Sequence, residues 1–350
     1  MTNVKHSQTI SSLRPILMLL IVFIHISVDK SEYGFIAGYI YDIISKGICL
    51  TAVPLFFIIS GYLFFANIEE NNKFSFTSYK HKLHSRLSTL LLPYIIWNLI
   101  ALLYIIILQK THQNSNLFTW VMWQDGNISF REFLMSFVSL RGGEPLLYQF
   151  WFLRNLIIIN LFAPIIYYIL RRSQFFLLLL ICLSLWIVLD DKSQIVHFEL
   201  TTLCFYSIGA YLQIQKINIK HYLRQAKYLI PIYLIMLLLQ PMINSYIYKH
   251  ITTLMGIIVL VYLVNYLHRK KIITRFNSLT SFSFFLYAFH TFIIRYIQNF
   301  LSNHLPINAF YGIIIYFSSV ILSIFISYFL YLLISKISPK TINILTGNRK

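Results

Sequence analysis

The chain alternates between long apolar blocks and short segments that hold most of its charged residues. Many blocks approach the ~20 residues that an α-helix needs to cross the hydrocarbon core of a bilayer. Inside lipid every backbone N–H and C=O needs an internal partner, which favours helices for such blocks. The pattern predicts ten membrane-spanning helices, over residues 12–28, 48–66, 87–108, 150–170, 174–189, 199–214, 228–245, 251–267, 282–302 and 310–335.

The composition supports a membrane protein. Apolar residues make up 58% of the chain and charged residues 11%, whereas roughly a quarter of an average soluble domain is charged. The sequence lacks the alternating ~10-residue strands of a membrane β-barrel. The first apolar block has no small-residue cleavage site, so we expect it to be retained. We therefore expect an all-α integral membrane protein whose single domain covers residues 1–350.

Charge is distributed unevenly between the predicted loops. A net charge of +18 in a soluble chain would suggest a nucleic-acid partner. Cytoplasmic loops of membrane proteins are themselves rich in Lys and Arg, so we expect no nucleic acid here. With the N-terminus inside, 20 of the 29 basic residues fall on the internal side, and both termini are predicted to be cytoplasmic.

The first predicted span contains two ionisable residues, Arg14 and His25. Eleven residues are about three helical turns, so we expect both side chains on nearly one face, roughly 16 Å apart along the axis. Asp29 lies four residues after His25, where it is expected to orient the imidazole. Alternatively, Arg14 anchors the helix end at the headgroups and His25 bonds a neighbouring helix. The shared face favours a cation for an anionic cytoplasmic ligand, with a base deeper in the membrane.

Other ionisable residues in or beside the spans are also candidate functional residues. Such side chains are costly in lipid, so their presence there suggests a role. Lys82 and Arg86 share one helical face at the cytoplasmic side, although the ordinary bias of internal loops explains them equally well. Arg154 is expected to hold a substrate or an oxyanion, or else a lipid headgroup. We expect His290 and Arg295 in the ninth span to face the interior.

Several short sequence motifs follow one another along the chain, and their order is informative. They are the Arg14–His25 pair and the segments Phe56-Phe57-Ile58-Ile59-Ser60-Gly61-Tyr62, Leu91-Leu92-Pro93-Tyr94, Phe150-Trp151-Phe152-Leu153-Arg154, Gly209-Ala210-Tyr211-Leu212 and Phe284-Phe285-Leu286-Tyr287-Ala288-Phe289-His290. Their joint order along nearly the whole chain resembles the acyltransferase-3 family of multi-span membrane acyltransferases. The resemblance is greatest to the stand-alone branch that acetylates cell-surface or lipid-linked polysaccharides.

This resemblance implies an O-acetyltransferase of the bacterial cytoplasmic membrane. It implies that acetyl-CoA is the donor substrate and that Arg14, Lys82 and Arg86 hold its phosphates. His25 would act as general base on a carbohydrate hydroxyl, and Asp29 would fix the imidazole tautomer.

Arg154, His290 and Arg295 would then serve the acceptor substrate or the oxyanion. We expect no permanently bound cofactor and no metal site, because the three cysteines lack paired or metal-ligand spacing.

Two other functions remain open. A transporter or flippase for a lipid-linked glycan would use the charged interior as a pathway, although the internal repeats common in transporters are missing. An acyltransferase with a lipid, peptide or amine acceptor would need the same residues. Motifs of serine esterases, zinc hydrolases and phosphate-binding loops do not occur in the sequence.

Overall fold

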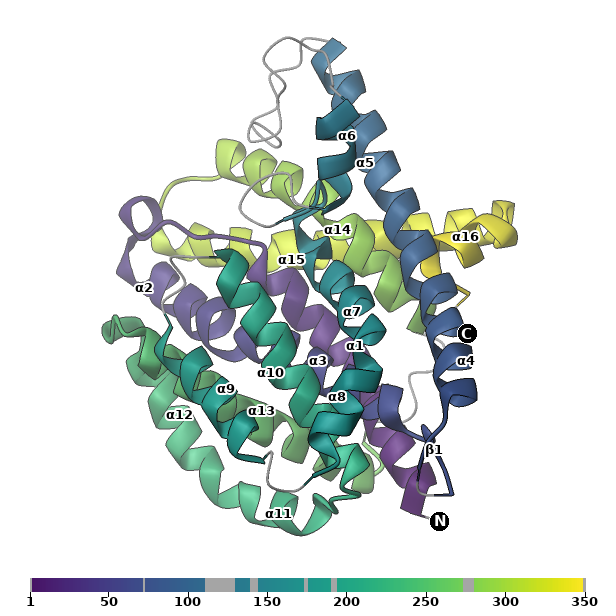
Figure 1. The fold of residues 1–350 in the computed structure, drawn as a ribbon. Helices are drawn as coiled ribbons and strands as arrows, with labels where there is room; N and C mark the ends of the chain where they lie inside the picture. The colour runs from purple at the N-terminus through teal and green to yellow at the C-terminus, as the bar shows by residue number, and fades with distance from the viewer. Residues whose placement is uncertain are drawn as a thin grey trace.

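The computed structural model describes residues 2–71, 73–110, 130–138, 144–172, 176–189, 194–272 and 280–348. They form a bundle of helices in which α1 runs through the centre (Figure 1). The only strands among these residues are β1 (Glu69–Glu70) and β2 (Lys73–Phe74), which pair in a short antiparallel hairpin. The structure therefore confirms the all-α prediction.

The helices of the first half are α1 (Thr2–Ile24), α2 (Lys30–Ile43), η1 (Ile44–Ile48), η2 (Cys49–Thr51), α3 (Ala52–Phe65), α4 (Phe76–Arg86), η3 (Leu87–Leu91), α5 (Leu92–Lys110), α6 (Phe130–Val138), η5 (Tyr148–Phe150), α7 (Trp151–Leu161) and α8 (Ala163–Leu170). Those of the second half are α9 (Phe176–Val188), α10 (Gln194–Ile214), α11 (Lys220–Gln225), η7 (Ala226–Tyr228), α12 (Leu229–Leu239), η8 (Gln240–Met242), α13 (Tyr246–Arg269), α14 (Thr280–His304), α15 (Ala309–Ile337) and α16 (Pro339–Thr346).

Several helices suit a membrane. Among the described residues, four continuous helical segments are long and apolar enough to cross a bilayer, namely Lys30–Phe65, Phe76–Leu108, Tyr246–Arg269 and Ala309–Ile337, and a bent pair adds a fifth candidate. The apolar stretches Ile10–Ile24 and Phe176–Val188 are shorter. The count of ten spans and the cytoplasmic termini stay predictions.

Prolines break two of the predicted spans. The span expected over 150–170 consists of Tyr148–Leu161 and Ala163–Leu170, which meet at 67°. Pro164 stands at the start of α8, where it has no N–H to continue the preceding helix and its ring would clash with the carbonyl of residue 160. The span expected over 228–245 is likewise only the 11-residue α12, which gives way to η8 with Pro241 in its first turn. The prediction of continuous helices was wrong at both places.

The segment before the second predicted span is helical rather than a loop. Charged residues of this segment pair with one another in the structure. The buried carboxylate of Asp42 pairs with Lys30 Nζ at 2.5 Å and with Lys46 Nζ at 3.0 Å. Helix α2 is followed directly by the π-helical turn η1, by η2 and by α3.

Two glycines let α3 and α10 pack with their backbones in contact. A Cβ atom on Gly61 would collide with the carbonyl oxygen of Tyr206, and one on Gly209 would collide with that of Ile58. Small residues at such crossings are typical of helix pairs in membranes. The contact explains why glycines occur in both the Ser60-Gly61-Tyr62 and Gly209-Ala210 segments.

Segments expected on the internal side lie together in the structure. Lys216, after α10, pairs with Glu69 of β1 at 3.5 Å, and Gln215 donates to the carbonyl of Leu170 at 2.9 Å. The N and C labels lie toward the same end as α4 and β1 (Figure 1). The contacts of Lys216 and Gln215 join the segments that follow α3 and α10 to the end of α8.

The chain ends with α16, which docks on α5. Trp97 Nε1 donates to the carbonyl of Leu345 at 3.0 Å. Gly347 closes α16 in the left-handed region (φ 68°), and a Cβ there would collide with the backbone carbonyl of Thr89 in η3. The C-terminal residues thus contact the turn that follows Arg86.

Candidate active site

Three cavities follow one another along α1. The arginine cavity, of about 470 Å³, is lined by Arg14, Lys82, Arg86 and Thr280 among others. The middle cavity, of about 140 Å³, shares Arg14, Arg86 and Thr280 with it. A third, the histidine cavity, holds about 320 Å³ and is named for His25.

The middle and histidine cavities also share part of their walls. Ile21 of α1, Phe152 of α7 and Tyr287 of α14 line both. The three cavities are therefore neighbours, with Arg14 and Arg86 on the walls at one end and His25 on the wall at the other.

Arg14 and Arg86 have no counter-ion within the described part of the chain. Both side chains are half-buried, and neither forms a hydrogen bond or an ion pair there. No acidic residue lines the arginine cavity or the middle cavity among the described residues. Two converging cations without a partner are costly in a bundle of apolar helices, so an anionic ligand would relieve their repulsion.

Lys82 differs from these two arginines. Its ammonium group donates to the carbonyls of Phe64, at 2.9 Å, and Ala66. These carbonyls lie at the C-terminal end of α3, where the helix dipole favours a cation. Lys82 therefore stabilises a helix end and also lines the arginine cavity.

His25 stands directly after α1 and is half-buried. Its Nδ1 lies 3.0 Å from the hydroxyl of Tyr148, which η5 supplies from far along the chain. The apolar pattern does not single out Tyr148, because this residue precedes the predicted fourth span. The available signal was its place two residues before the Phe150-Trp151 landmark.

His290 lies against His25, with 5.1 Å between the ring centroids. It is fully buried, as expected from the cost of an imidazole in lipid, and its Nδ1 lies 2.9 Å from the carbonyl of Leu286. Arg295, one turn beyond, has an exposed side chain. The expected burial of Arg295 was wrong, but its charge still acts on His25 and Tyr148.

The family model described as an acyltransferase domain, that of acyltransferase-3, matches residues 8–332. The chain belongs to the acyltransferase-3 family. No significant match was found among curated proteins or among solved structures. Membership in this family, together with the apolar helices, makes the protein a membrane acyltransferase.

In this acyltransferase-3 chain, Asp29 does not orient His25. Helix α1 ends at Ile24, so the expected helical spacing between the two residues is lost. The exposed carboxylate of Asp29 caps α2 by accepting hydrogen bonds from the backbone N–H and hydroxyl of Ser31, at 2.8 and 2.7 Å. These bonds lower the pKa of Asp29 below its ordinary value. The predicted role for Asp29 as third member of a triad was wrong, and Tyr148 holds Nδ1 of His25 instead.

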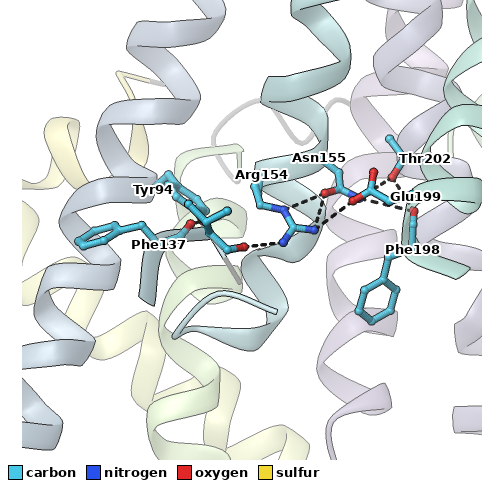
Figure 2. A network of polar contacts seen from close by, with 8 residues as sticks. Tyr94, Phe137, Arg154, Asn155, Phe198, Glu199 and Thr202 are labelled. Carbon is cyan, nitrogen blue, oxygen red and sulfur yellow. Dashed lines mark hydrogen bonds and ion pairs between the residues drawn. The ribbon is translucent and has the colours of Figure 1, made fainter. Parts of the chain in front are cut away.

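Arg154 of the acyltransferase-3 chain is tied into a network of its own (Figure 2). Its guanidinium donates to the carbonyl of Val138 at 2.6 Å and to Asn155 Oδ1 at 2.9 and 2.7 Å, and it lies 3.4 Å from Glu199 Oε1. Asn155 in turn donates to Thr202 Oγ1 at 3.0 Å. Arg154 does not line the three cavities. This network joins α6, α7 and α10.

Proposed function

We propose that the protein transfers an acetyl group from acetyl-CoA to a hydroxyl of a cell-surface or lipid-linked polysaccharide. The observation that carries this proposal is the series of cavities between the unpaired Arg14 and Arg86 and the imidazole of His25. A thioester donor is long and has its negative charge at one end only. Such a ligand fits a passage with cations at one end and a base at the other.

The donor phosphates would bind in the arginine cavity. Guanidinium groups form strong charge-assisted hydrogen bonds with phosphate oxygens. Arg14 and Arg86 are the principal ligands in this proposal, and Lys82 contributes its remaining donor. The pantetheine arm would pass through the middle cavity, whose walls include the apolar side chains of Met18, Phe56 and Leu156.

His25 would act as general base on the acceptor hydroxyl. When Nδ1 carries the proton and donates to Tyr148, Nε2 has a free lone pair. The acceptor oxygen attacks the thioester carbonyl while its proton moves to Nε2. The C–S bond then breaks, and the departing thiolate takes the proton from the imidazole. The products are the ester and free CoA thiol.

The acceptor would enter through the histidine cavity. Aromatic side chains dominate part of its wall, including Trp151 and Phe198, whose rings stack at 4.1 Å and 8°. Aromatic faces are suitable partners for the C–H groups of sugar rings. We place the protein in the bacterial cytoplasmic membrane with both termini inside, so the donor binds from the cytoplasm and the acceptor from the outer half.

Replacing the base tests this mechanism. His25→Ala should lower acetylation by roughly 10²- to 10⁴-fold, the usual contribution of a general base, while membrane abundance stays normal. The measurement is the acetyl proton signal in the NMR spectrum of purified glycan from cells that express each variant. His304→Ala is the matched control, because His304 is an exposed histidine at the end of α14. Undiminished acetylation in His25→Ala would refute the base assignment.

Transfer from radiolabelled acetyl-CoA by the purified protein separates the alternatives. A flippase for a lipid-linked glycan would move the glycan without labelling it. An enzyme with a lipid, peptide or amine acceptor would label that acceptor and leave polysaccharide unlabelled. Label in the polysaccharide supports the proposal.

A further inference from the structure

Gln149 presents an unpaired acceptor atom beside the proposed base. Its side chain is 3% exposed and lines the histidine cavity. The amide nitrogen donates to Thr291 Oγ1 at 2.9 Å and lies 3.4 Å from the carbonyl of Ala288. Because a carbonyl can only accept, these contacts fix which end of the amide is nitrogen. The opposite atom, Oε1, is buried and has no hydrogen-bond partner among the described residues.

His290 presents a second such atom. Its Nδ1 faces the carbonyl of Leu286 and must therefore carry the proton. Nε2 of the neutral ring can then only accept a hydrogen bond, and within the described part of the chain it has no partner. Gln149 bonds residues on either side of His290, and the His290 ring lies against that of His25. Of the residues that carry these two acceptors, Gln149 lines the histidine cavity, and His290 lies behind it against the ring of His25 without lining the three cavities.

The chemistry of these atoms restricts their ligand. A buried acceptor without a donor costs the desolvation of that group, so native proteins seldom leave one without a reason. An acceptor atom repels an oxyanion, a phosphate or a carboxylate. It binds an O–H or N–H group. The ligand beside His25 should therefore bring a donor in addition to the hydroxyl that is acylated.

We infer that Gln149, supported by His290, forms a subsite for a second hydroxyl of the acceptor. The protein then acylates vicinal diols in preference to isolated alcohols. This inference rests on the proposed function and narrows its acceptor class. Amide N–H groups of the pantetheine arm are the other source of donors. Gln149 lines only the histidine cavity of the three, and the proposed path of the arm runs through the other two.

A binding experiment tests the inference without requiring catalysis. The full-length protein with His25→Ala, in lipid nanodiscs, is titrated calorimetrically with trans-cyclohexane-1,2-diol and with cyclohexanol. One additional hydrogen bond to a buried acceptor should favour the diol by about tenfold in Kd. Adding Gln149→Met, which keeps the length of the side chain, should abolish this preference. Gln215→Leu is the control, because the Gln215 amide bonds carbonyls near Arg171 outside the three cavities.

A second variant adds His290→Phe to the His25→Ala protein. This substitution should reduce the preference for the diol over cyclohexanol. Monodisperse elution in size-exclusion chromatography verifies folding of each variant. Equal affinity for the diol and the alcohol, or a preference that survives Gln149→Met, would overturn the subsite. Weaker binding of coenzyme A in Gln149→Met, with the diol preference intact, would assign Gln149 to the donor and would also overturn it. Failure of the proposed function looks different: protein with His25 intact binds the diol preferentially and transfers no acetyl group to it.

Discussion

Arg14 and Arg86 share a residue type and a helical setting with Arg154, but their surroundings differ completely. The guanidinium of Arg154 contacts oxygen atoms on α6, α7 and α10. The guanidinium groups of Arg14 and Arg86 face cavities and have no hydrogen-bonding partner in the described chain. An arginine in an apolar helix is costly in either case. The fold supplies hydrogen-bond partners for Arg154, whereas in the described chain it supplies none for the guanidinium groups of Arg14 and Arg86.

Arg154 therefore joins helices of the bundle, whereas we propose that Arg14 and Arg86 bind the donor. Sequence position does not reveal this difference, since all three occur beside apolar segments with aromatic neighbours. The partners of Arg154 come from distant segments, and only the packed structure shows them. Substitution of Arg14 or Arg86 should therefore affect acetyl transfer, and substitution of Arg154 should affect the stability of the bundle.

Among the substitutions that test this comparison of arginines, the largest effect is expected at Arg14 and Arg86. Arg14→Ala or Arg86→Ala removes charge-assisted bonds to the donor phosphates, so the KM for acetyl-CoA should rise roughly ten- to hundredfold. Stability should stay the same or increase, because the remaining arginine loses a repulsive neighbour. Initial rates at varied acetyl-CoA measure this. Arg172→Ala, an exposed arginine outside the arginine cavity, is the control. Unchanged KM and turnover would remove Arg14 or Arg86 from the donor site.

Substitution of Arg154 should lower the stability of the protein rather than raise the KM for the donor. Arg154→Met leaves Asn155 Oδ1 and the carbonyl of Val138 without their donor, which should cost about 2 kcal/mol of stability. The ion pair contributes little of this, because Glu199 is 54% exposed. Thermal unfolding in detergent measures the loss, with Glu199→Gln as the milder comparison. A variant of normal stability that has lost acetyl transfer would contradict the structural role.

The smallest effect is expected at Asp29. Asp29→Ala removes the cap of α2 and should lower the thermal midpoint slightly without changing acetyl transfer. The hydrogen bonds from Ser31 lower the pKa of this carboxyl. Its contribution to stability is therefore present above its ordinary pKa and is lost as the pH falls through the lowered value.

Asp29→Ser keeps a capping oxygen and should restore the midpoint. Unfolding scans at neutral and acidic pH measure both variants. A loss of activity comparable to that of His25→Ala would return Asp29 to the active site.

Much of the helical content could be predicted from the apolar blocks, and the Arg14–His25 spacing identified the two ends of the cavity series. The Pro164 break was also predictable in principle, because a proline within an apolar block bends or ends a helix. Tyr148 and Gln149 could not be placed, since they precede the predicted span and meet α1 and α14 only through tertiary packing. Asp29 was misplaced because the turn after Ile24 leaves no signature in the apolar pattern.

The docked C-terminal helix has a practical consequence for handling the protein. Gly347 touches the backbone of Thr89, and Thr89 lines the arginine cavity. A purification tag fused directly after Lys350 would begin four residues after Gly347 and would bring its own bulk and charge toward a wall of the arginine cavity. A tag on a long polar linker avoids this interference, and comparing the two formats would reveal how strongly α16 and its surroundings influence the arginine cavity.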